Sequence, residues 1–335
     1  MTRIGFGPFA ARARRSASLP IVLATALLLA VSPLLAPGSV GGSALVGMLP
    51  FAAVLALAAA GQSLVVRQGG LDLSVAGMMS LASVIVTEET HLARGLELAL
   101  VACLVSGCLT GLLVTRLAVT PLIATLAVNA LLVGTVYRIT HGILSSAVPE
   151  PLQRFTFDKT AGIPDIVVLV AAVLLVGAAV LGWTVAGRRF VAAGMSPGAA
   201  RAVGIRVHRY GVMTYVVASL AYGAAGVLLA GFVGTPSLSA GDAYLLPTIA
   251  AVVLAGNRLG GGEGSVVAVG IAALFLTQLQ QVVLGMGAPN STQLIIQGSI
   301  IGLGMAARQT RAALPRLWTL ASRIAPTQGR AYQAP

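Results

Sequence analysis

Charged residues are scarce in this chain of 335 residues, where Asp, Glu, Lys and Arg together make up 9%. A soluble domain carries about 25% charged residues, so this composition excludes an ordinary water-facing surface. Hydrophobic residues make up 57% of the chain, and its mean hydropathy is +0.94. We therefore predict a polytopic membrane protein.

The chain has a single lysine, Lys159, and the other 20 of its 21 basic residues are arginines. The chain has no Gly-x-x-x-x-Gly-Lys-Ser/Thr loop, so it cannot bind ATP phosphates by that route. Its net charge of +12 could suggest nucleic acid, but the arginines sit mostly at the ends of apolar segments. That placement indicates membrane topology, and we expect no nucleic-acid partner.

Histidine and cysteine are too few and too scattered for a metal site. His91, His141 and His208 lie in three different loops. Cys103 and Cys108 share one apolar segment without the spacing of a metal-binding pair, and we interpret them as packed side chains. No Ser/His/Asp arrangement can be assembled from these loops. We expect no catalytic residue, no metal and no cofactor bound by this chain.

Ten apolar segments are long enough to span a hydrocarbon core of about 30 Å, which takes about 20 helical residues. They lie approximately at residues 19–36, 45–66, 71–87, 95–115, 118–137, 164–186, 211–233, 243–257, 265–284 and 292–307. The sequence thus predicts an all-α transmembrane helical bundle of about ten spans. Pro247 lies within the short segment 243–257, so we expect that helix to be broken and to face a pathway.

Basic residues are distributed unequally between the two sides of these spans. If both termini are cytoplasmic, four basic residues lie outside, Arg94, Arg138, Arg154 and Lys159, against 17 inside. Seven of the nine acidic residues fall at or near external ends. Because cytoplasmic loops carry an excess of arginine and lysine, we predict cytoplasmic N and C termini.

This topology divides the chain into a basic cytoplasmic segment at 1–18, a transmembrane domain at 19–308 and an arginine-rich cytoplasmic tail at 309–335. The first apolar run could instead be a cleaved signal peptide, which would leave nine spans and an external N-terminus. An external loop at about 139–163 contains prolines and mixed charge. We expect this loop to be ordered and to contact a partner.

The largest cytoplasmic loop, at about 187–210, carries the signals of a short helix. Ser196 can cap its start, Pro197 suits the first helical position, and Gly204 can end it after about two turns. Two interpretations stay open from these residues alone. The loop is either an organised basic helix that contacts a partner or a solvated basic connection.

Two pairs of stretches suggest an internal repeat. Gly69-Gly-Leu-Asp-Leu-Ser-Val-Ala aligns with Gly260-Gly-Gly-Glu-Gly-Ser-Val-Val, and upstream Leu49-Pro-Phe-Ala-Ala-Val resembles Leu246-Pro-Thr-Ile-Ala-Ala-Val. Each pair runs in the same direction through the membrane. Internal repeats are common in transporters, whose substrate sites lie near the repeat interface, although chance matches are also common in a chain rich in Gly, Ala and Val.

Eleven polar side chains lie within or at the ends of the predicted spans: Gln62, Asp72, Ser74, Thr125, Asn129, Asn257, Gln278, Gln280, Gln281, Gln293 and Gln297. A solute pathway needs such groups to replace the water hydrogen bonds of a polar solute. The first seven are our pathway candidates. Each could instead bond a neighbouring helix, and the pairs Gly107/Gly111 and Gly298/Gly302 predict close helix packing.

Asp72 stands out among these residues because an unpaired carboxylate in lipid costs on the order of a few kcal/mol. It could cap the helix that follows by accepting backbone N–H groups of Ser74 or Val75. It could also line a cytoplasmic gate or a solute site.

Three motifs carry a family resemblance. They are Gly69-Gly-Leu-Asp-Leu-Ser-Val, Gly194-Met-Ser-Pro-Gly-Ala-Ala-Arg-Ala-Val-Gly-Ile-Arg-Val and Ile249-Ala-Ala-Val-Val-Leu-Ala-Gly-Asn-x-x-Gly-Gly-Gly-x-Gly-Ser-Val. Together they resemble the permease subunits of ribose-type monosaccharide ABC importers, over about residues 45–308. Branched-chain amino-acid permeases share the layout but typically lack the first motif, so they rank second.

This resemblance implies partners. They are a cytoplasmic ABC ATPase that holds ATP and magnesium, an extracytoplasmic sugar-binding protein and a second permease copy, all at a bacterial inner membrane. The helix in the cytoplasmic loop is then similar to the coupling helix that docks on the ATPase. The implied coupling residues are Gly194, Ser196, Pro197, Ala199, Ala200, Arg201, Gly204, Ile205 and Arg206. Relatives usually carry Glu where this chain has Gly198, which leaves Arg201 and Arg206 as the charges that can pair with the ATPase.

Other classes of function stay open at this point. A secondary transporter would need an ion-coupling acid, and Asp72 is almost the only intramembrane candidate. A non-transporting scaffold would purify with neither an ATPase nor a binding protein. The solute of an importer could be a pentose, a hexose, a sugar-like signal or a nucleoside.

Overall fold

The computed structural model describes residues 8–144 and 147–289, together with residues 291, 292, 294–296, 298, 299 and 302. Helices dominate this part of the chain. Their bounds are α1 Pro8–Leu35, η1 Pro37–Val40, α2 Gly42–Arg67, α3 Val75–Glu88, α4 Leu92–Thr115, α5 Pro121–Thr140, α6 Glu150–Phe157, α7 Asp165–Trp183, α8 Val185–Met195, α9 Pro197–Ala202, α10 Val207–Val233, α11 Asp242–Leu254 and α12 Val266–Gly285. Two short strands, β1 Lys159–Thr160 and β2 Ile163–Pro164, pair as an antiparallel hairpin.

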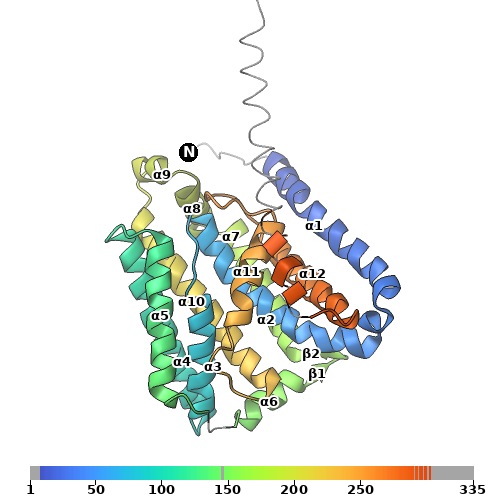
Figure 1. The fold of residues 1–335 in the computed structure, drawn as a ribbon. Helices are drawn as coiled ribbons and strands as arrows, with labels where there is room; N and C mark the ends of the chain where they lie inside the picture. The colour runs from blue at the N-terminus through green and yellow to red at the C-terminus, as the bar shows by residue number, and fades with distance from the viewer. Residues whose placement is uncertain are drawn as a thin grey trace, which may run out of the picture.

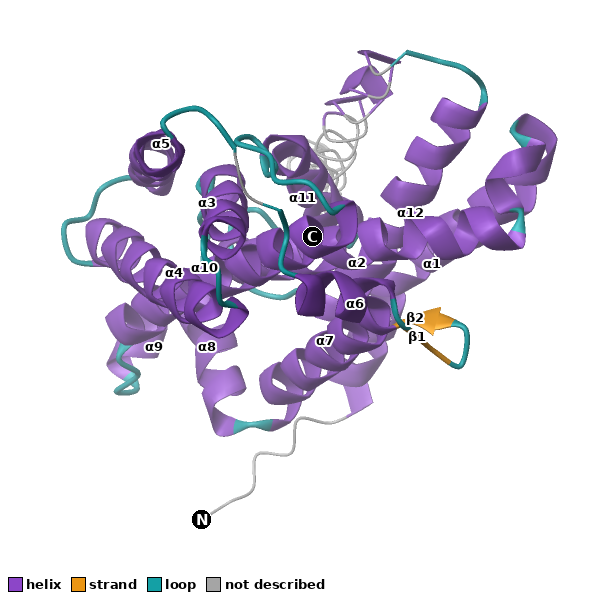
Figure 2. Ribbon diagram, turned by 90° about the horizontal axis from the view of Figure 1, so that it is seen from below, coloured by secondary structure: helices purple, strands orange, loops and turns teal. Residues whose placement is uncertain are grey.

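The centre of the bundle is formed by α2, α3 and α10. Helix α10 packs along α4, α2 and α3, while α2 also contacts α12, α11 and α7. Helix α1 lies on one outer side against α12, and α5 lies on the opposite outer side against α3 and α4 (Figures 1 and 2). This arrangement leaves the central helices buried and the outer helices exposed along much of their length.

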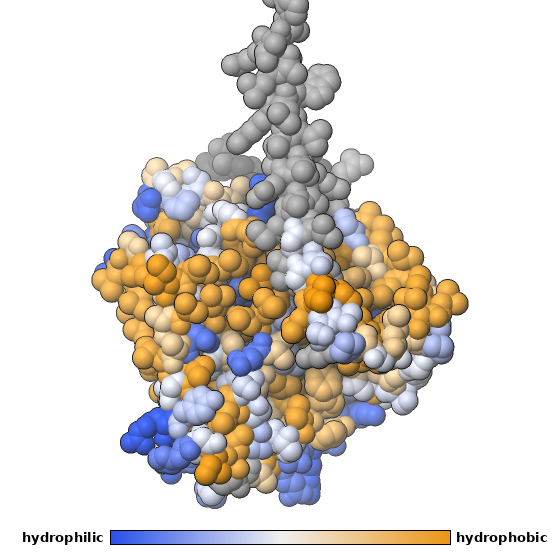
Figure 3. Space-filling view, in the orientation of Figure 1, coloured by the Kyte–Doolittle hydropathy of each residue, from blue (hydrophilic) through white to orange (hydrophobic). Residues whose placement is uncertain are grey.

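Within the described residues, six helices are long and apolar enough to cross a membrane: α2, α4, α5, α7, α10 and α12. Three shorter apolar helices accompany them, namely residues 19–35 of α1, α3 and α11. Figure 3 shows apolar side chains over most of the middle of the visible face, which is the surface that lipid requires. The chain is an all-α membrane protein, as predicted. The tenth predicted segment, 292–307, and the tail at 309–335 lie wholly or largely outside the described residues, as do Gln293 and Gln297.

The third predicted span, at 71–87, is wrong as a continuous helix. Helix α3 begins only at Val75 and has 14 residues, so it is about 21 Å long at 1.5 Å per residue and shorter than a hydrocarbon core of about 30 Å. Residues 68–74 are not helical. Irregular backbone is tolerated at membrane depth where protein covers it, and Gly70, Asp72 and Ser74 in this loop are buried.

Two other expectations need correction. Helix α11 continues through Pro247 without a break, although Pro247 does line a cavity, as described below. Helix α7 ends at Trp183, before the predicted boundary at residue 186, because Thr184 caps a new helix by accepting the Gly187 N–H. The predicted cytoplasmic loop therefore begins inside helix α8.

Glycines allow the central helices to approach each other closely. A Cβ at Gly226 of α10 would collide with the backbone of Met79 in α3. A Cβ at Gly107 of α4 would lie 2.5 Å from the Val216 Cα in α10, and one at Gly111 would lie 2.8 Å from the Val212 Cα. The predicted close packing at Gly107/Gly111 is confirmed. No described atom lies within 4 Å of a Cβ built at Gly298 or Gly302, so that pair makes no such contact within the described residues.

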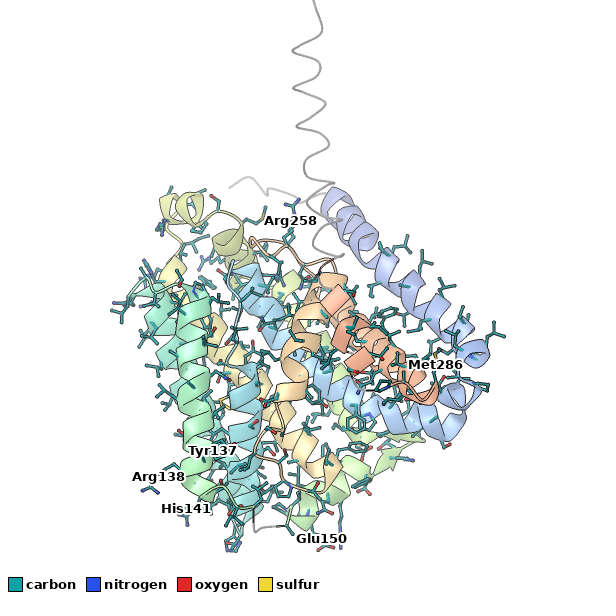
Figure 4. All side chains as sticks on the ribbon, viewed as in Figure 1. Tyr137, Arg138, His141, Glu150, Arg258 and Met286 are labelled. Carbon is teal, nitrogen blue, oxygen red and sulfur yellow. The ribbon has the colours of Figure 1, made fainter. Side chains whose placement is uncertain are left out.

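The predicted ordered loop at 139–163 contains helix α6 and most of the hairpin, although α5 itself continues to Thr140. Arg154 Nη2 lies 2.6 Å from Glu150 Oε1 within α6. Helix α6 lies at one end of the bundle and α9 at the other (Figure 1), and Figure 4 places Glu150 and Arg258 at these opposite ends. We call them the α6 end and the α9 end.

Candidate functional site

Asp72 organises the start of α3. Its Oδ1 accepts the Ser74 backbone N–H at 2.9 Å and the Ser74 hydroxyl at 2.6 Å. The carboxylate is 2% exposed and lies next to the N-terminus of α3, where the helix dipole favours a negative charge. Of the two contacts predicted for capping, the bond to Ser74 is present. Val75 is instead the first residue of the helix.

Gln62 ties this loop to the centre of the bundle. With its amide oriented to pair with the Asp72 backbone, Gln62 donates to the Asp72 carbonyl at 3.1 Å and accepts the Asp72 N–H at 3.3 Å. The same amide nitrogen lies 2.8 Å from the Tyr222 hydroxyl of α10. Both Gln62 and Tyr222 are fully buried. Three segments of the chain therefore meet in one hydrogen-bonded cluster.

Helix α5 holds the same loop from the other side. The Thr125 hydroxyl accepts the Leu73 N–H at 3.0 Å, and Asn129 Oδ1 accepts the Gly77 N–H at 2.8 Å. The first N–H groups of a helix have no hydrogen-bond acceptor within that helix. Such an acceptor usually comes from a capping residue next to the helix, and here Asn129 provides it from α5. Five predicted pathway residues, Gln62, Asp72, Ser74, Thr125 and Asn129, are thus brought together, with their polar groups bonded to protein.

Removing the Thr125 hydroxyl is expected to destabilise the protein. Thr125→Val leaves the Leu73 N–H without its acceptor, which costs about 1–3 kcal/mol for a buried group. Thr135→Val on the same helix is the matched control, because the Thr135 hydroxyl bonds only the Leu131 carbonyl of its own helix, at 2.8 Å. Thermal unfolding of the purified protein in detergent should show a lower Tm for Thr125→Val alone. Equal Tm values for the two variants would contradict the assigned role of Thr125.

The other two predicted pathway residues lie elsewhere. Asn257 follows α11, and its Oδ1 accepts the Ser265 N–H at 3.1 Å. Gln278 lies on α12, where its Nε2 donates to the Ser32 hydroxyl of α1 at 3.1 Å. Both side chains are fully buried. They join segments of the bundle and do not meet the cluster at Asp72.

The two loops of the suggested repeat lie close together near the α9 end, where a Cβ at Gly69 would lie 3.8 Å from the Gly260 carbonyl oxygen, and α2 bonds the second loop directly. The Gly262 N–H donates to the Arg67 carbonyl at 2.8 Å, and Arg67 Nε donates to the Gly262 carbonyl at 3.3 Å. The Arg67 guanidinium also lies 5.4 Å from the centre of the Phe190 ring in α8. A Cβ at Gly194 would collide with the Arg67 carbonyl, which explains a glycine there. This junction connects α2, α8 and the loop before α12.

A central cavity of about 700 Å³ lies toward the α6 end, between the first half of α2, the end of α10, α11 and the second half of α12. Its polar lining residues are Ser83, Thr235, Ser237, Tyr244, Thr277, Gln280 and Gln281. The Ser83 hydroxyl is buried and has no hydrogen-bond partner within the described part of the chain. None of the seven predicted pathway residues lines this cavity.

The sequence did contain a signal for these lining residues. Thr277, Gln280, Gln281 and Leu284 follow the i, i+3, i+4, i+7 spacing of one helix face, and all four line the cavity. Gln280 and Gln281 were recognised as polar residues of a span, but their shared face with Thr277 was not used. Ser83 gave no local signal, because serine is common in packed transmembrane helices.

The short helix predicted in the cytoplasmic loop is present as α9. The Ser196 hydroxyl accepts the Ala199 N–H at 3.4 Å, Pro197 is the first helical residue, and Gly204 ends the motif with φ +80°. Ser196, Pro197, Ala199, Arg201, Gly204 and Arg206 are exposed, and Ile205 is half-buried. Gly194 and Ala200 are buried, so these two predicted coupling residues shape the loop from inside.

Comparison with known proteins matches this chain to permease components of transport systems. Residues 44–303 match the family model described as branched-chain amino acid transport system / permease component. The chain is 30% identical over 292 residues to the ribose import permease protein RbsC of Escherichia coli K12, covering 85% of this chain and 91% of the relative. It is 32% identical over 270 residues to RbsC of Bacillus subtilis, covering 77% and 82%.

A third relative is the autoinducer 2 import system permease protein LsrC of an Enterobacter species, which is 29% identical over 235 residues. That alignment covers 69% of this chain and 68% of the relative. Among solved structures, none matches the chain.

Proposed function

This chain belongs to the family of branched-chain amino acid transport system permease components, and we propose that it forms the membrane pathway of an ATP-driven importer for a monosaccharide or a similar small polar solute. It is an ABC transporter permease of the ribose type and a multi-pass protein of the bacterial inner membrane. The relatives are import permeases for ribose and autoinducer 2, which favours a sugar-like solute over a branched-chain amino acid.

The observation that carries this proposal is the central cavity. Its volume of about 700 Å³ falls within the range of about 300–1,000 Å³ typical of small-molecule sites. Hydroxyl and amide groups among apolar walls suit a solute with many hydroxyls. With the termini cytoplasmic, the α6 end is external, so the cavity faces the side from which a binding protein would deliver its solute.

We assign coupling to helix α9. In this orientation α9 faces the cytoplasm, and its exposed surface is available to a separate ATPase subunit that would hold ATP and magnesium. A second permease copy and an extracytoplasmic binding protein complete the proposed importer. The junction at Arg67 offers a connection from α8, which precedes α9, to α2 and to the loop before α12.

Transport then follows an alternating-access scheme. ATP binding at the partner must favour one conformation of the complex over the other, because a ligand with equal affinity for both states shifts nothing. The polar cluster at Asp72 fixes the position of α3, so we assign it to support of the pathway wall. The solute itself would contact the cavity residues, among which Ser83 has a buried hydroxyl without a hydrogen-bond partner in the described part of the chain.

Uptake measurements on two serine variants test the cavity assignment. Ser83→Ala and Ser219→Ala each remove a buried hydroxyl that has no hydrogen-bond partner among the described residues, but Ser83 alone lines the cavity. Loss of one hydrogen bond to solute, worth about 0.5–1.5 kcal/mol, lowers uptake about two- to tenfold. Uptake of labelled ribose into vesicles that hold the complete importer should fall for Ser83→Ala and stay unchanged for Ser219→Ala. An equal result for both variants would count against this cavity as the solute site.

A further inference from the structure

A second hollow, which we call the arginine groove, runs along the outside of the bundle between α2, α7, α8 and α10. Its volume is about 820 Å³, and it lies toward the α9 end, away from the central cavity. Apolar and small side chains form its walls, among them Leu57 and Leu64 of α2, Leu174 of α7, and Met213 and Val217 of α10. No atom of the described residues lies within 4 Å of a Cβ built at Gly177, so the groove is open above that residue.

The length of the groove matches one membrane leaflet. On α7 the lining runs from Val173 to Leu181, and the eight helical steps between them rise about 12 Å at 1.5 Å each. On α10 it runs from Tyr210 to Ala221, a rise of about 16 Å. Half of a hydrocarbon core of about 30 Å is about 15 Å. An extended acyl chain that lies along these helices is therefore of the right length.

Three arginines line the α9 end of this groove. Arg189 comes from α8, Arg209 comes from α10, and Arg206 precedes α10 directly. All three side chains are exposed, and none forms an ion pair among the described residues. A cluster of positive charge thus meets one end of an apolar groove, and the other end has no charged lining residue.

Aromatic residues place these arginines at the depth of lipid headgroups. Trp183 ends α7 and is 83% exposed, and Tyr210 lines the groove next to Arg209. Tryptophan and tyrosine are enriched at the membrane–water interface. A Cβ at Gly187 would collide with the Val180 carbonyl, so α8 folds tightly against the end of α7 and carries Arg189 to the same level.

We propose that the arginine groove binds an anionic phospholipid, with an acyl chain along α7 and α10 and its phosphate at Arg189 and Arg209. Basic pockets between membrane helices on the cytoplasmic side bind anionic headgroups, and arginine pairs with phosphate through two parallel hydrogen bonds. A free phosphate ion makes no use of the apolar walls. A helix of a second protein copy would bury three unpaired arginines, which is costly.

Fluorescence of Trp183 provides the measurement. The sequence has two tryptophans, and Trp318→Phe leaves Trp183 as the reporter next to the groove residues Val180 and Leu181. The full chain is placed in phosphatidylcholine nanodiscs that contain an increasing fraction of brominated phosphatidylglycerol. Parallel discs contain brominated phosphatidylcholine instead. Bromine quenches tryptophan at short range, so the two titrations compare occupancy by the two headgroups.

Phosphatidylglycerol should quench at a mole fraction at least about fivefold lower than phosphatidylcholine, since each arginine near the surface adds about 1 kcal/mol of attraction. Arg189→Gln with Arg209→Gln should remove this preference. The matched control is Arg116→Gln with Arg258→Gln, which takes two exposed arginines of the α9 end that do not line the groove. The control should keep the full preference. Unchanged quenching of the groove variant by brominated phosphatidylcholine shows that it has folded and inserted.

Three results would overturn the proposal. Equal quenching of the parent chain by the two lipids would mean that the groove does not select an anionic headgroup. If the groove variant and the control variant lost the preference for phosphatidylglycerol equally, the preference would come from the general positive charge of the α9 end and not from the groove. Failure of either lipid to quench Trp183 would indicate that protein covers the groove, as a second copy of the chain would.

Discussion

Val203→Asp is expected to abolish ATP-driven uptake while the protein still inserts in the membrane. Val203 follows α9 directly and is 75% exposed, although it is a large apolar side chain at the α9 end. A substitution at an exposed position usually changes the free energy of unfolding by no more than about 0.5 kcal/mol, so a large functional effect would report a lost partner contact. Burying an unpaired carboxylate at the centre of an interface costs about 2 kcal/mol or more, which weakens ATPase binding at least about 30-fold.

Leu117→Asp is the matched control for this prediction. Leu117 is an apolar residue at the same end, in the turn between α4 and α5, and is 67% exposed. Co-purification of the ATPase and ATP-driven uptake should survive Leu117→Asp and be lost with Val203→Asp. Normal uptake by the Val203 variant would show that α9 does not couple the permease to the ATPase. Loss of uptake in both variants would assign the effect to added charge and not to α9.

Gly226→Val is expected to have the largest effect on folding. A Cβ at this position would collide with the backbone of Met79, and a backbone cannot rotate away as a flexible side chain can. Overpacking of this kind costs about 3 kcal/mol or more at its upper end, against a total stability of about 5–15 kcal/mol. Helices α3 and α10 would have to separate, which would also disturb the cluster at Gln62, Asp72 and Tyr222.

Gly134→Val separates this packing effect from the general effect of valine in a membrane helix. Gly134 is an exposed residue of α5, and in the part of the chain that the structure describes no atom lies within 4 Å of a Cβ built there. The amount of folded protein extracted in detergent and its Tm should fall sharply for Gly226→Val and change little for Gly134→Val. Similar Tm values for the two variants would show that α3 and α10 do not approach as closely as this structure places them.

Local chemistry explains which parts of the fold could be predicted from the sequence. Long apolar segments predicted the six described helices that are long enough to cross a membrane. The cap at Ser196, the proline at 197 and the glycine at 204 predicted α9, because each of these signals acts within one turn of helix. The end of α7 was misplaced because the apolar residues Val185 and Ala186 continue the segment past the break. The boundary is marked by Thr184, which caps the next helix, and hydropathy alone does not show this cap.

The candidate site depended on contacts that a single sequence does not contain. Thr125 and Leu73 are 52 residues apart, and Gln62 and Tyr222 are 160 apart. Polarity within a span could therefore identify Gln62 and Thr125 as unusual residues, but it could not distinguish a bond to protein from a contact with solute. The two stretches of the suggested repeat were a better guide to proximity, since their glycine-rich loops lie close together at Gly69 and Gly260.

A measurement of which energy source drives uptake tests most directly whether this chain is the permease of an ATP-driven importer. The chain is placed in vesicles with its partner ATPase and sugar-binding protein, and uptake of labelled ribose is measured with ATP or with a proton gradient as the only energy source. Our account predicts that uptake requires ATP, the ATPase and the binding protein together, and that a proton gradient alone drives none. Uptake by the chain alone on a proton gradient would contradict the account and would identify a secondary transporter.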